Sequence, residues 1–519
     1  MTEERKIRTR FAPSPTGMLH LGGIRTALYN YLLAKKYNGD FILRIEDTDQ
    51  TRFVEGAEKY ILDTLKWLNI VPNEGAINID TATGEINSIG EYGPYIQSQR
   101  KDIYQKYAHE LVEKGYAYYA FDSNEAIEEM RGKSEEDNVS VTQYDSKRRE
   151  YMKNSLTLPK EEVDAMIRNG EKYVIRYKTE RNSFINFYDE VRGYIKVDTN
   201  TLDDKILLKS DGMATYHLAS VVDDHIMNIS HVIRGEEWLP SAPLHVELYR
   251  AFGWEEDMPK LVHLPVVLKP SGKGKLSKRD ADEGGFSIFP LSWYDNKNGK
   301  EVIGLREKGF LPEAIINALA LLGWNPGNNV ELMDEHTLVE MFSIKKISKA
   351  GARFDFKKFE WFNHQYIQKK EDLSIYIKKG IEELGIYCEE EKINTIINLI
   401  KERCFFTTDI WRKAKLFFIR PEDYCNKILS DEEIKKSLEW IDCFIEKKKK
   451  KNWEEDILHA TCNDLLQQNN LHLKDVMPTF RLILFGETNG PDIIKSIVIL
   501  GKEETKIRIG LFNKKYLTP

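Results

Sequence analysis

The segment Ala12–Gly23, with the sequence APSPTGMLHLGG, combines a histidine with bare glycine backbone. A Pro/Ser/Gly turn follows a short candidate strand, and a helix is expected to begin near His20. Free N–H groups and the dipole at a helix N-terminus favour anions. Glycine allows a phosphate to approach the backbone, and histidine can donate a hydrogen bond without a fixed full charge. The segment therefore indicates a phosphate site at His20, Gly22 and Gly23, although a turn needed only for packing is the alternative.

A second group with chemical potential is the basic segment Gly272–Asp280, GKGKLSKRD, much further along the chain. Lys275 and Lys278 flank Ser277 in a loop that two glycines make flexible. Two ammonium groups on such a loop suit closure over a polyphosphate that becomes more negative in a transition state. Taken alone, the segment is better explained as an ordinary solvated basic loop.

Acidic residues supply two further candidates. Glu46 stands in the segment RIEDTD at the end of a predicted strand, where a parallel sheet faces its ligand, and could hold an ammonium group. A surface acid or a helix cap is the alternative. The cluster Asp223, Asp224 and His225 suggests a metal, but no further His or Cys stands at a familiar spacing. Structural hydrogen bonding is the better explanation, and we expect no metal site.

The elements that must position these residues follow a βαβ rhythm. The first block predicts strands at Ile7–Ala12 and Phe41–Ile45 and helices at Leu21–Tyr37 and Val54–Leu68. A second block predicts strands at Ile206–Lys209, Val232–Arg234 and Leu261–Leu268 and a helix at Leu239–Phe252. Between the blocks, Tyr107–Asp189 is charged and lacks this rhythm, which indicates an insertion. After Gly351 helical periodicity dominates. These patterns predict a doubly wound α/β domain with an α+β insertion, followed by an all-α C-terminal region.

Composition and charge exclude some classes of protein. The 519 residues are 41% apolar and rich in aromatic side chains, which excludes a disordered chain. The net charge of −7 neither indicates nor excludes a nucleic-acid partner, because binding depends on local basic faces. The polar N-terminus and the lack of a long apolar run lead us to expect a soluble cytoplasmic protein without membrane contact. The five scattered cysteines are expected to be free thiols.

Read in order, these segments resemble class I aminoacyl-tRNA synthetases, and more narrowly the bacterial type of glutamyl-tRNA synthetase. The opening A-P-S-P-T-G-x-L-H-x-G, then R-I-E-D-T-D, then K-L-S-K-R carry the resemblance. It extends through nearly the whole chain. Further matching segments are Gly93–Tyr107, Thr215–Trp238, Leu311–Trp324, Gly351–Ile367 and Met477–Gly486.

The resemblance implies roles for individual residues. His20 and Gly22 match the first and third positions of the family's His-Ile-Gly-His signature, and Lys275–Arg279 match its mobile Lys-Met-Ser-Lys-Ser loop. His20, Lys275 and Lys278 would be catalytic through the ATP phosphates, and Gly22, Gly23 and Ser277 would help to bind ATP. The glutamate pocket would comprise Arg10, Ala12, Ser14, Glu46, Tyr216, Ser220 and Arg234.

Three departures from the family pattern stand out. Gly23 replaces the second histidine of the signature, and Ser220 stands where an asparagine of the pocket is expected. The insertion contains no cysteine, so the zinc site of some relatives is not expected here. ATP with Mg²⁺ is the only cofactor that the resemblance implies.

The resemblance also implies the fold and the partners. A Rossmann-like catalytic domain would carry an insertion that guides the tRNA 3′ end, a stem-contact domain and a helical anticodon-binding region. The expected boundaries are 1–106 and 191–270 for the two halves of the catalytic domain, 107–190 for the insertion, 271–350 for the stem-contact domain and 351–519 for the anticodon region. Candidate stacking and basic residues for the anticodon are Phe354, Phe356, Trp361, Trp411, Arg353, Lys357, Lys358 and Arg412.

The expected activity is that of a glutamate–tRNA ligase. It would form glutamyl-adenylate from L-glutamate and ATP and transfer the amino acid to tRNA(Glu), as a monomer. A catalytically silent tRNA-binding scaffold is the alternative from another class, but such a protein is expected to lack His20 or a loop lysine. A truncated relative that glutamylates a modified tRNA base would lack the helical tail. A nucleotidyltransferase would lack the set Arg10, Glu46 and Arg234.

Overall fold

The computed structural model describes residues 5–80, 82–136, 143–295, 299–425, 429–447 and 453–516, apart from the side chains of 132–136, 278 and 295. The chain forms two compact units. The first comprises Met1–Glu307 and Pro312–Phe356, and the second comprises Lys308–Leu311 and Lys357–Pro519. Each unit has its own buried core.

The first unit begins with alternating strands and helices, as the sequence predicts. Apolar residues recur along the first helix at Ile24, Leu28 and Leu32, and all three are buried against the sheet. The elements of this block are β1 (Arg8–Phe11), α1 (Leu21–Lys36), β2 (Asp40–Leu43), α2 (Ala57–Trp67), β3 (Glu74–Ile79), β4 (Ile86–Ile89) and α3 (Lys101–Glu113).

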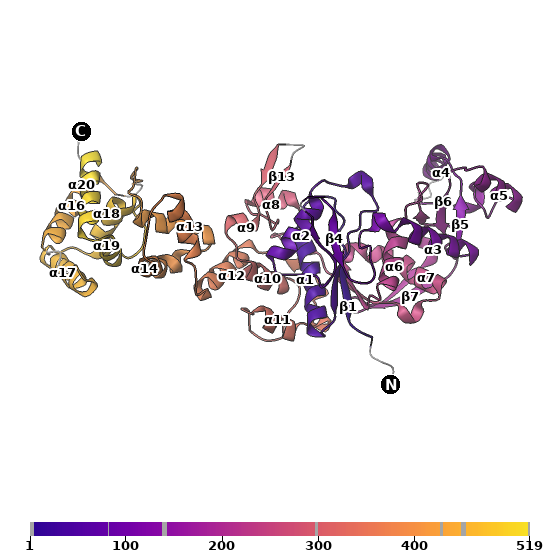
Figure 1. Cartoon of the computed structure of the whole chain (residues 1–519), viewed down its shortest axis with the longest axis horizontal. Helices are drawn as coiled ribbons and strands as arrows, with labels where there is room; N and C mark the ends of the chain where they lie inside the picture. The colour runs from indigo at the N-terminus through magenta and orange to yellow at the C-terminus, as the bar shows by residue number, and fades with distance from the viewer. Residues whose placement is uncertain are drawn as a thin grey trace. The chain divides into compact units, whose positions relative to one another are not determined.

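The second βαβ block completes the main sheet. Its elements are α6 (Tyr216–Ile226), β10 (His231–Gly235), α7 (Ala242–Phe252) and β11 (Lys260–Leu264). The eight strands run in the order β4-β3-β2-β1-β10-β11-β7-β8, parallel from β3 to β7, with antiparallel strands at both edges. The strand order reverses between β1 and β10, so crossovers leave this point in opposite directions. Helices consequently cover both faces of the sheet, with α1 and α7 on different sides in Figure 1.

Between the two blocks lies a smaller antiparallel sheet of order β5-β6-β9. Its strands are β5 (Ala117–Ala120), β6 (Val174–Tyr177) and β9 (Ile206–Leu208). The same part of the chain includes α4 (Asn124–Glu136), α5 (Lys160–Arg168), and the hairpin β7 (Phe184–Asp189) and β8 (Gly193–Asp198) that joins the main sheet. A mixed α+β insertion is therefore present.

One strand belongs to a different sheet from the one predicted. The segment Ile206–Lys209 is expected in the second βαβ block, and a strand is present there, but β9 pairs with β6 in the smaller sheet through Ile175 and Arg176. The assignment to the main sheet is wrong. Residue patterning can identify a strand, but it does not identify the strand's hydrogen-bonded neighbour.

The rest of the first unit consists of short elements. They are β12 (Val267–Leu268), α8 (Lys278–Gly284), β13 (Trp293–Asp295), β14 (Lys300–Val302), α9 (Leu305–Lys308), α10 (Pro312–Ala320), α11 (Glu335–Met341) and β15 (Ala352–Arg353). β12 and β15 pair in parallel, which joins the segment before the Lys275 loop to the end of the unit. α10 packs on α1 and thereby supports the helix that follows His20.

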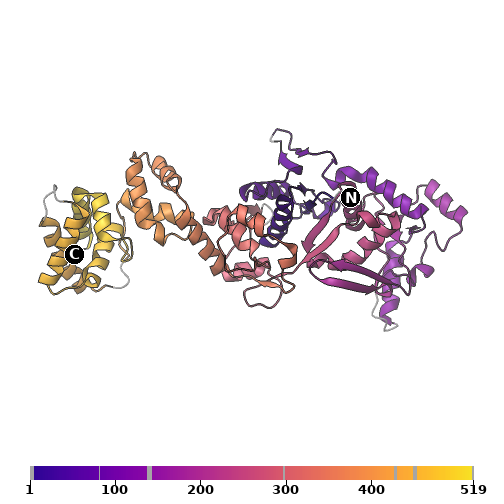
Figure 2. The same cartoon turned by 90° about the horizontal axis from the view of Figure 1, so that it is seen from below.

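Helices account for every named element of the second unit, seen in orange to yellow in Figures 1 and 2. α12 (Phe356–Lys369) leads into it. The others are α13 (Ile375–Glu383), α14 (Glu390–Ile400), α15 (Thr407–Ala414), α16 (Asp431–Glu446), α17 (Glu455–Gln468), α18 (Leu473–Phe485), α19 (Ile493–Leu500) and α20 (Lys502–Tyr516). The predicted fold class, a doubly wound α/β domain with an insertion and an all-helical C-terminal region, is confirmed.

Candidate active site

A cavity of about 570 Å³ lies where the carboxyl ends of β1 and β10 meet. This is the point of reversed strand order, at which doubly wound sheets bind their ligands, and the volume is typical of small-molecule sites. Most residues predicted as site residues line it. They are Arg10, Ala12, Ser14, His20, Gly22, Gly23, Glu46, Tyr216, Arg234 and Lys275.

His20 caps the N-terminus of α1 with its side chain. Its Nδ1 accepts a hydrogen bond from the backbone N–H of Gly22 at 3.0 Å. A Cβ at position 22 would lie 2.9 Å from the ring, so glycine keeps this cap uncrowded. Desolvation in the cavity, with a contribution from Lys275, lowers the pKa of His20. A neutral ring that accepts at Nδ1 carries its proton on Nε2, so His20 can offer a donor to an anionic ligand.

Arg10 is held in place by a carboxylate. Its Nε and Nη2 donate to the two oxygens of Asp224 at 2.9 and 3.3 Å. Both side chains are buried. Burial alone would raise the pKa of Asp224, but Arg10 and Arg44 outweigh that effect and the pKa lies below its ordinary value. The Arg10 charge is thus partly balanced before any ligand binds.

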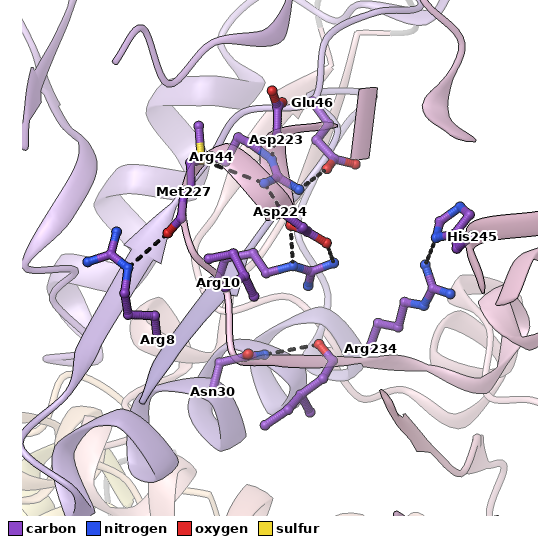
Figure 3. Close-up of polar contacts among 12 residues, drawn as sticks. Arg8, Arg10, Asn30, Arg44, Glu46, Asp223, Asp224, Met227, Arg234 and His245 are labelled. Carbon is purple, nitrogen blue, oxygen red and sulfur yellow. Dashed lines mark hydrogen bonds and ion pairs between the residues drawn. The ribbon is translucent and has the colours of Figure 1, made fainter. Parts of the chain in front are cut away.

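Arg44, which is fully buried, connects this pair to Glu46. Its Nη1 donates to Asp224 Oδ1 at 2.8 Å and its Nη2 to Glu46 Oε1 at 2.9 Å. Figure 3 shows the guanidinium between the two acids. Burial raises the pKa of Glu46, and Arg44 and Arg10 oppose that rise. Because Arg44 engages Oε1, Oε2 remains for a cationic group in the cavity.

The neighbouring acid, Asp223, has a structural role. It accepts hydrogen bonds from Arg100 Nε at 2.7 Å, from Gln97 Nε2 at 2.9 Å and from Tyr104 OH at 2.8 Å, and it is fully buried. These donors connect α6 to α3 and to the segment that precedes it. The hydrogen-bonding explanation of the Asp223–Asp224 pair therefore accounts for both residues.

Arg234 has a different environment from Arg10. Its Nη1 donates to Tyr216 OH at 2.7 Å and lies 3.5 Å from His245 Nδ1, and its Nε donates to His263 Nε2 at 3.0 Å. In Figure 3 the guanidinium turns toward His245, apart from the group around Asp224. Trp238 covers Tyr216 with ring centroids 4.3 Å apart. Arg234 Nη2 is buried and has no hydrogen-bond partner among the described residues.

The structure describes the side chain of Lys275 but only the backbone of Lys278. Lys275 Nζ lies 3.5 Å from Glu237 Oε1, and both side chains are about half exposed. Ser277 caps α8 in a capping box with Asp280 and does not line the cavity. The backbone of Lys278 begins α8, but its side chain lies outside the described residues.

Ser220 is the predicted glutamate-pocket residue that does not line the cavity. It stands on α6, one turn after Tyr216 and one turn before Asp224, and is fully buried. Its hydroxyl has no hydrogen-bond partner in the described part of the chain, and it is not among the lining residues. A contact between Ser220 and a ligand remains a prediction.

Sequence reasoning overlooked several lining residues, two of which follow the strand that carries Arg234. Glu237 and Trp238 follow β10 directly, after Arg234, and both line the cavity. Their place just past the carboxyl end of a parallel strand is the signal that could have identified them.

The candidate anticodon residues Phe354 and Trp361 differ in how deeply they are buried. Phe354 is almost fully buried and lies 5.3 Å from the Phe286 ring, which is a core arrangement. Trp361 is partly exposed and has Lys358 Nζ 4.1 Å above its ring. Of these two aromatic residues, only Trp361 offers a face on which a base could stack.

Two further observations concern metals and membranes. No group of three or more His, Cys, Asp or Glu side chains in the described residues is arranged to hold a metal ion. No helix in the same part of the chain has the length and apolar character needed to cross a membrane.

Comparisons with known proteins give matches over nearly the whole chain. The family model described as "tRNA synthetases class I (E and Q), catalytic domain" matches residues 6–361, and an anticodon binding domain matches 371–512. Glutamate–tRNA ligases of Amoebophilus asiaticus and Phocaeicola vulgatus are 52% and 49% identical to this chain, each over 98% of both proteins. The crystal structure of a glutamate tRNA ligase from Elizabethkingia meningosepticum in complex with its amino acid has a TM-score of 0.87 and 45% identity, and it covers 98% of this chain and 99% of that one.

Proposed function

The chain belongs to the glutamate–tRNA ligases, a family of class I aminoacyl-tRNA synthetases, and we propose that the cavity between β1 and β10 is its active site. The observation that carries the proposal is the meeting of His20, Lys275, Glu46 and Arg234 around one cavity. These groups offer phosphate donors and contacts for both ends of an amino acid. A catalytically silent scaffold finds no support in the comparisons.

The enzyme uses ATP to join L-glutamate to tRNA in two steps. First a carboxylate oxygen of glutamate attacks the α-phosphorus of ATP, the bond to the bridging oxygen breaks, and glutamyl-adenylate and diphosphate form. The 2′-hydroxyl of the terminal adenosine then attacks the activated carbonyl, and AMP leaves. The nucleophile of each step belongs to a substrate, so the protein contributes positioning and electrostatic stabilisation.

The phosphate side of the site lies at the start of α1. His20 would donate from Nε2 to a phosphate oxygen, because the Gly22 amide occupies Nδ1. Lys275 would exchange its contact with Glu237 for a phosphate, and Lys278 would follow on the same loop. The proposed ATP-binding residues are Gly22, Gly23, Lys275, Ser277 and Lys278.

The amino-acid side of the site uses the buried charges. Glu46 Oε2 would accept from the α-ammonium group, and Arg10 and Arg234 would each face a carboxylate. The proposed glutamate-binding residues are Arg10, Ala12, Ser14, Glu46, Tyr216, Ser220 and Arg234. Glutamine would be rejected because its neutral amide cannot balance a buried guanidinium, at a cost of about 2–5 kcal/mol.

Magnesium fits this site as a companion of the nucleotide. Mg²⁺ keeps several waters and usually needs only one or two carboxylates beside the phosphates. Glu237 lines the cavity, is about half exposed and contacts Lys275, so it can supply one such ligand. The ion would neutralise charge on the triphosphate.

We propose the following roles for the parts of the chain, with the boundaries that the family resemblance implies. Residues 1–106 and 191–270 form the catalytic domain, 107–190 receive the tRNA 3′ end, 271–350 contact the stem, and 351–519 bind the anticodon. β5 and β6 of the smaller sheet lie within 107–190 and support an acceptor-end lobe, although their partner strand β9 lies beyond that boundary. The match to an anticodon binding domain supports the last assignment. We further propose a monomer that acts in the cytoplasm, where tRNA is charged for translation.

The test is attachment of radiolabelled L-glutamate to tRNA in the presence of ATP and Mg²⁺, with purified glutamate and glutamine isoacceptors in parallel. We expect charging of the glutamate isoacceptor, and charging of both would make the enzyme non-discriminating. No charging of either, with ATP still bound, would contradict the proposal.

A further inference from the structure

Arg234 is surrounded by neutral hydrogen-bond partners. Tyr216 OH and His263 Nε2 accept from it, and His245 Nδ1 lies at the limit of a hydrogen bond. Burial lowers the pKa of both His245 and His263, and Arg234 lowers it further, while the hydrogen bond to Asp189 only partly opposes the shift for His263, which favours the neutral form of both rings. These neutral groups fix the direction of the guanidinium, and no carboxylate of the described residues is in direct contact with it.

Asp189 stands directly behind His263. His263 Nδ1 lies 2.7 Å from Asp189 Oδ2, and both side chains are fully buried. Three adjacent strands supply the residues, since β10 carries Arg234, β11 carries His263 in register with it, and β7 ends at Asp189. The sheet itself aligns the carboxylate, the imidazole and the guanidinium.

The hydrogen bonds fix the tautomer of His263. Arg234 Nε can only donate, so His263 Nε2 must accept, and the single proton of the neutral ring lies on Nδ1 and faces Asp189. Burial alone would raise the pKa of Asp189, but the hydrogen bonds from His263 and from backbone amides outweigh it, and the pKa lies below its ordinary value. Asp189 is itself immobilised, because its Oδ1 accepts from the amides of Val191 at 3.0 Å and Arg192 at 2.8 Å.

We propose that Asp189 and His263 are positioning residues for the glutamate site. They orient Arg234 through a neutral imidazole and leave its positive charge to be balanced by a carboxylate of the substrate. A carboxylate in direct contact would hold the guanidinium equally well but would compete with the substrate for its charge. The inference rests on the proposed function of the cavity and assigns a positioning role to Asp189 and His263, which do not line the cavity.

The first test is the substitution Asp189→Asn. Oδ1 accepts from the two turn amides, and Oδ2 accepts from the backbone amide of His263 at 3.1 Å as well as from its ring, so the new NH₂ group opposes two donors in either orientation. Where the NH₂ group replaces Oδ2, it faces His263 Nδ1. The ring must then accept at Nδ1 and carry its proton on Nε2, where it meets the N–H of Arg234. We expect glutamate to bind about 10- to 100-fold more weakly by calorimetry, because hydrogen bonds to charged groups have effects of this size. ATP affinity should change less than about twofold, and ¹⁵N NMR of His263 should show the proton moved from Nδ1 to Nε2.

A second pair of variants separates positioning from packing. His263→Gln can still present an oxygen to Arg234 Nε, whereas His263→Leu fills the space without an acceptor. We expect His263→Gln to retain most of the glutamate affinity and His263→Leu to lose as much as Asp189→Asn. Equal loss in both variants would contradict positioning through an acceptor.

Asp40→Asn is the matched control. Asp40 is also a buried acid of the main sheet, but it stands at the amino end of β2, where it pairs with Lys6 and Arg8. This control should lower stability without weakening glutamate binding. Parallel weakening of glutamate and ATP by Asp189→Asn, or equal effects of both Asp→Asn variants on glutamate, would overturn the inference. Absence of glutamate binding and tRNA charging in the unaltered enzyme would instead overturn the proposed function.

Discussion

Two buried arginines on the cavity wall differ in what balances their charge. Arg10 is bound by Asp224 through two nitrogens, while the direct partners of Arg234 are neutral. A charge that is already balanced gains less from a new carboxylate than one that is not. At the scale of single residues, Arg234 is therefore expected to contribute more than Arg10 to glutamate affinity.

Arg234→Ala should weaken glutamate binding by about 10- to 150-fold, as expected for loss of a hydrogen bond to a charged group, and should leave ATP affinity nearly unchanged. Steady-state KM values for the two substrates, or direct titration of each, measure the difference. Arg8→Ala is the control, because Arg8 is also a buried arginine of the main sheet, on β1, but it pairs with Asp40 and Glu74. Equal weakening of glutamate and ATP by Arg234→Ala would place Arg234 outside the glutamate pocket.

At the scale of elements, the smaller sheet depends on one buried acid. Asp204, just before β9, accepts hydrogen bonds from Tyr118 OH at 2.7 Å, Arg149 Nη1 at 3.0 Å and the Thr179 amide at 3.1 Å, and it is fully buried. These donors come from β5, from the 3₁₀ helix Arg148–Tyr151 and from the loop after β6. A buried acid with several hydrogen-bond donors holds together elements that are distant in sequence.

Asp204→Ala should destabilise this part of the protein by about 3–5 kcal/mol, because a buried cation and two other donors would lose their acceptor. Hydrogen exchange of the β5, β6 and β9 amides together with thermal unfolding measures the loss, and glutamate binding should remain. Asp164→Ala, on the exposed side of α5, should change stability by less than about 0.5 kcal/mol. Similar effects of the two substitutions would show that the Asp204 contacts contribute little.

For the molecule as a whole, buried histidines of the first unit make stability depend on pH. Burial lowers the pKa of His217 and of His231 to about 4 from 6.5. Because each pKa is lower in the folded state, the unfolded chain binds more protons between these values. Acidification from about pH 6.5 to pH 4 must therefore favour unfolding.

As the pH falls through this window, each such histidine should lower the free energy of unfolding by about 1.4 kcal/mol per pH unit. Urea titrations between pH 4.5 and 6.5 measure the slope. His231→Gln should reduce the slope by the contribution of one histidine, about 1.4 kcal/mol per pH unit. His336→Gln, at an exposed site, serves as the control. A slope unaffected by His231→Gln would contradict the burial argument for that residue.

Much of the site could be predicted from residue type and position alone. Arg10, Glu46 and Arg234 stand at or just past the carboxyl ends of parallel strands, and His20 stands at the start of a helix. Both positions are set by local sequence, because strand periodicity, a turn and a helix start can be read over a few residues. The helical C-terminal region was predictable for the same reason.

The tertiary structure alone decided which of these residues share partners. Asp189 and His263 belong to no motif and are far apart in sequence, and they meet because β11 lies between β10 and β7. Long-range packing likewise placed β9 in the smaller sheet and brought Asp224 of helix α6 to Arg10. Sequence determines where a strand or a charged side chain occurs, because those choices follow from local periodicity. It does not determine which strands become neighbours, because that choice depends on long-range packing, and here the pairing sets the charge balance of the site.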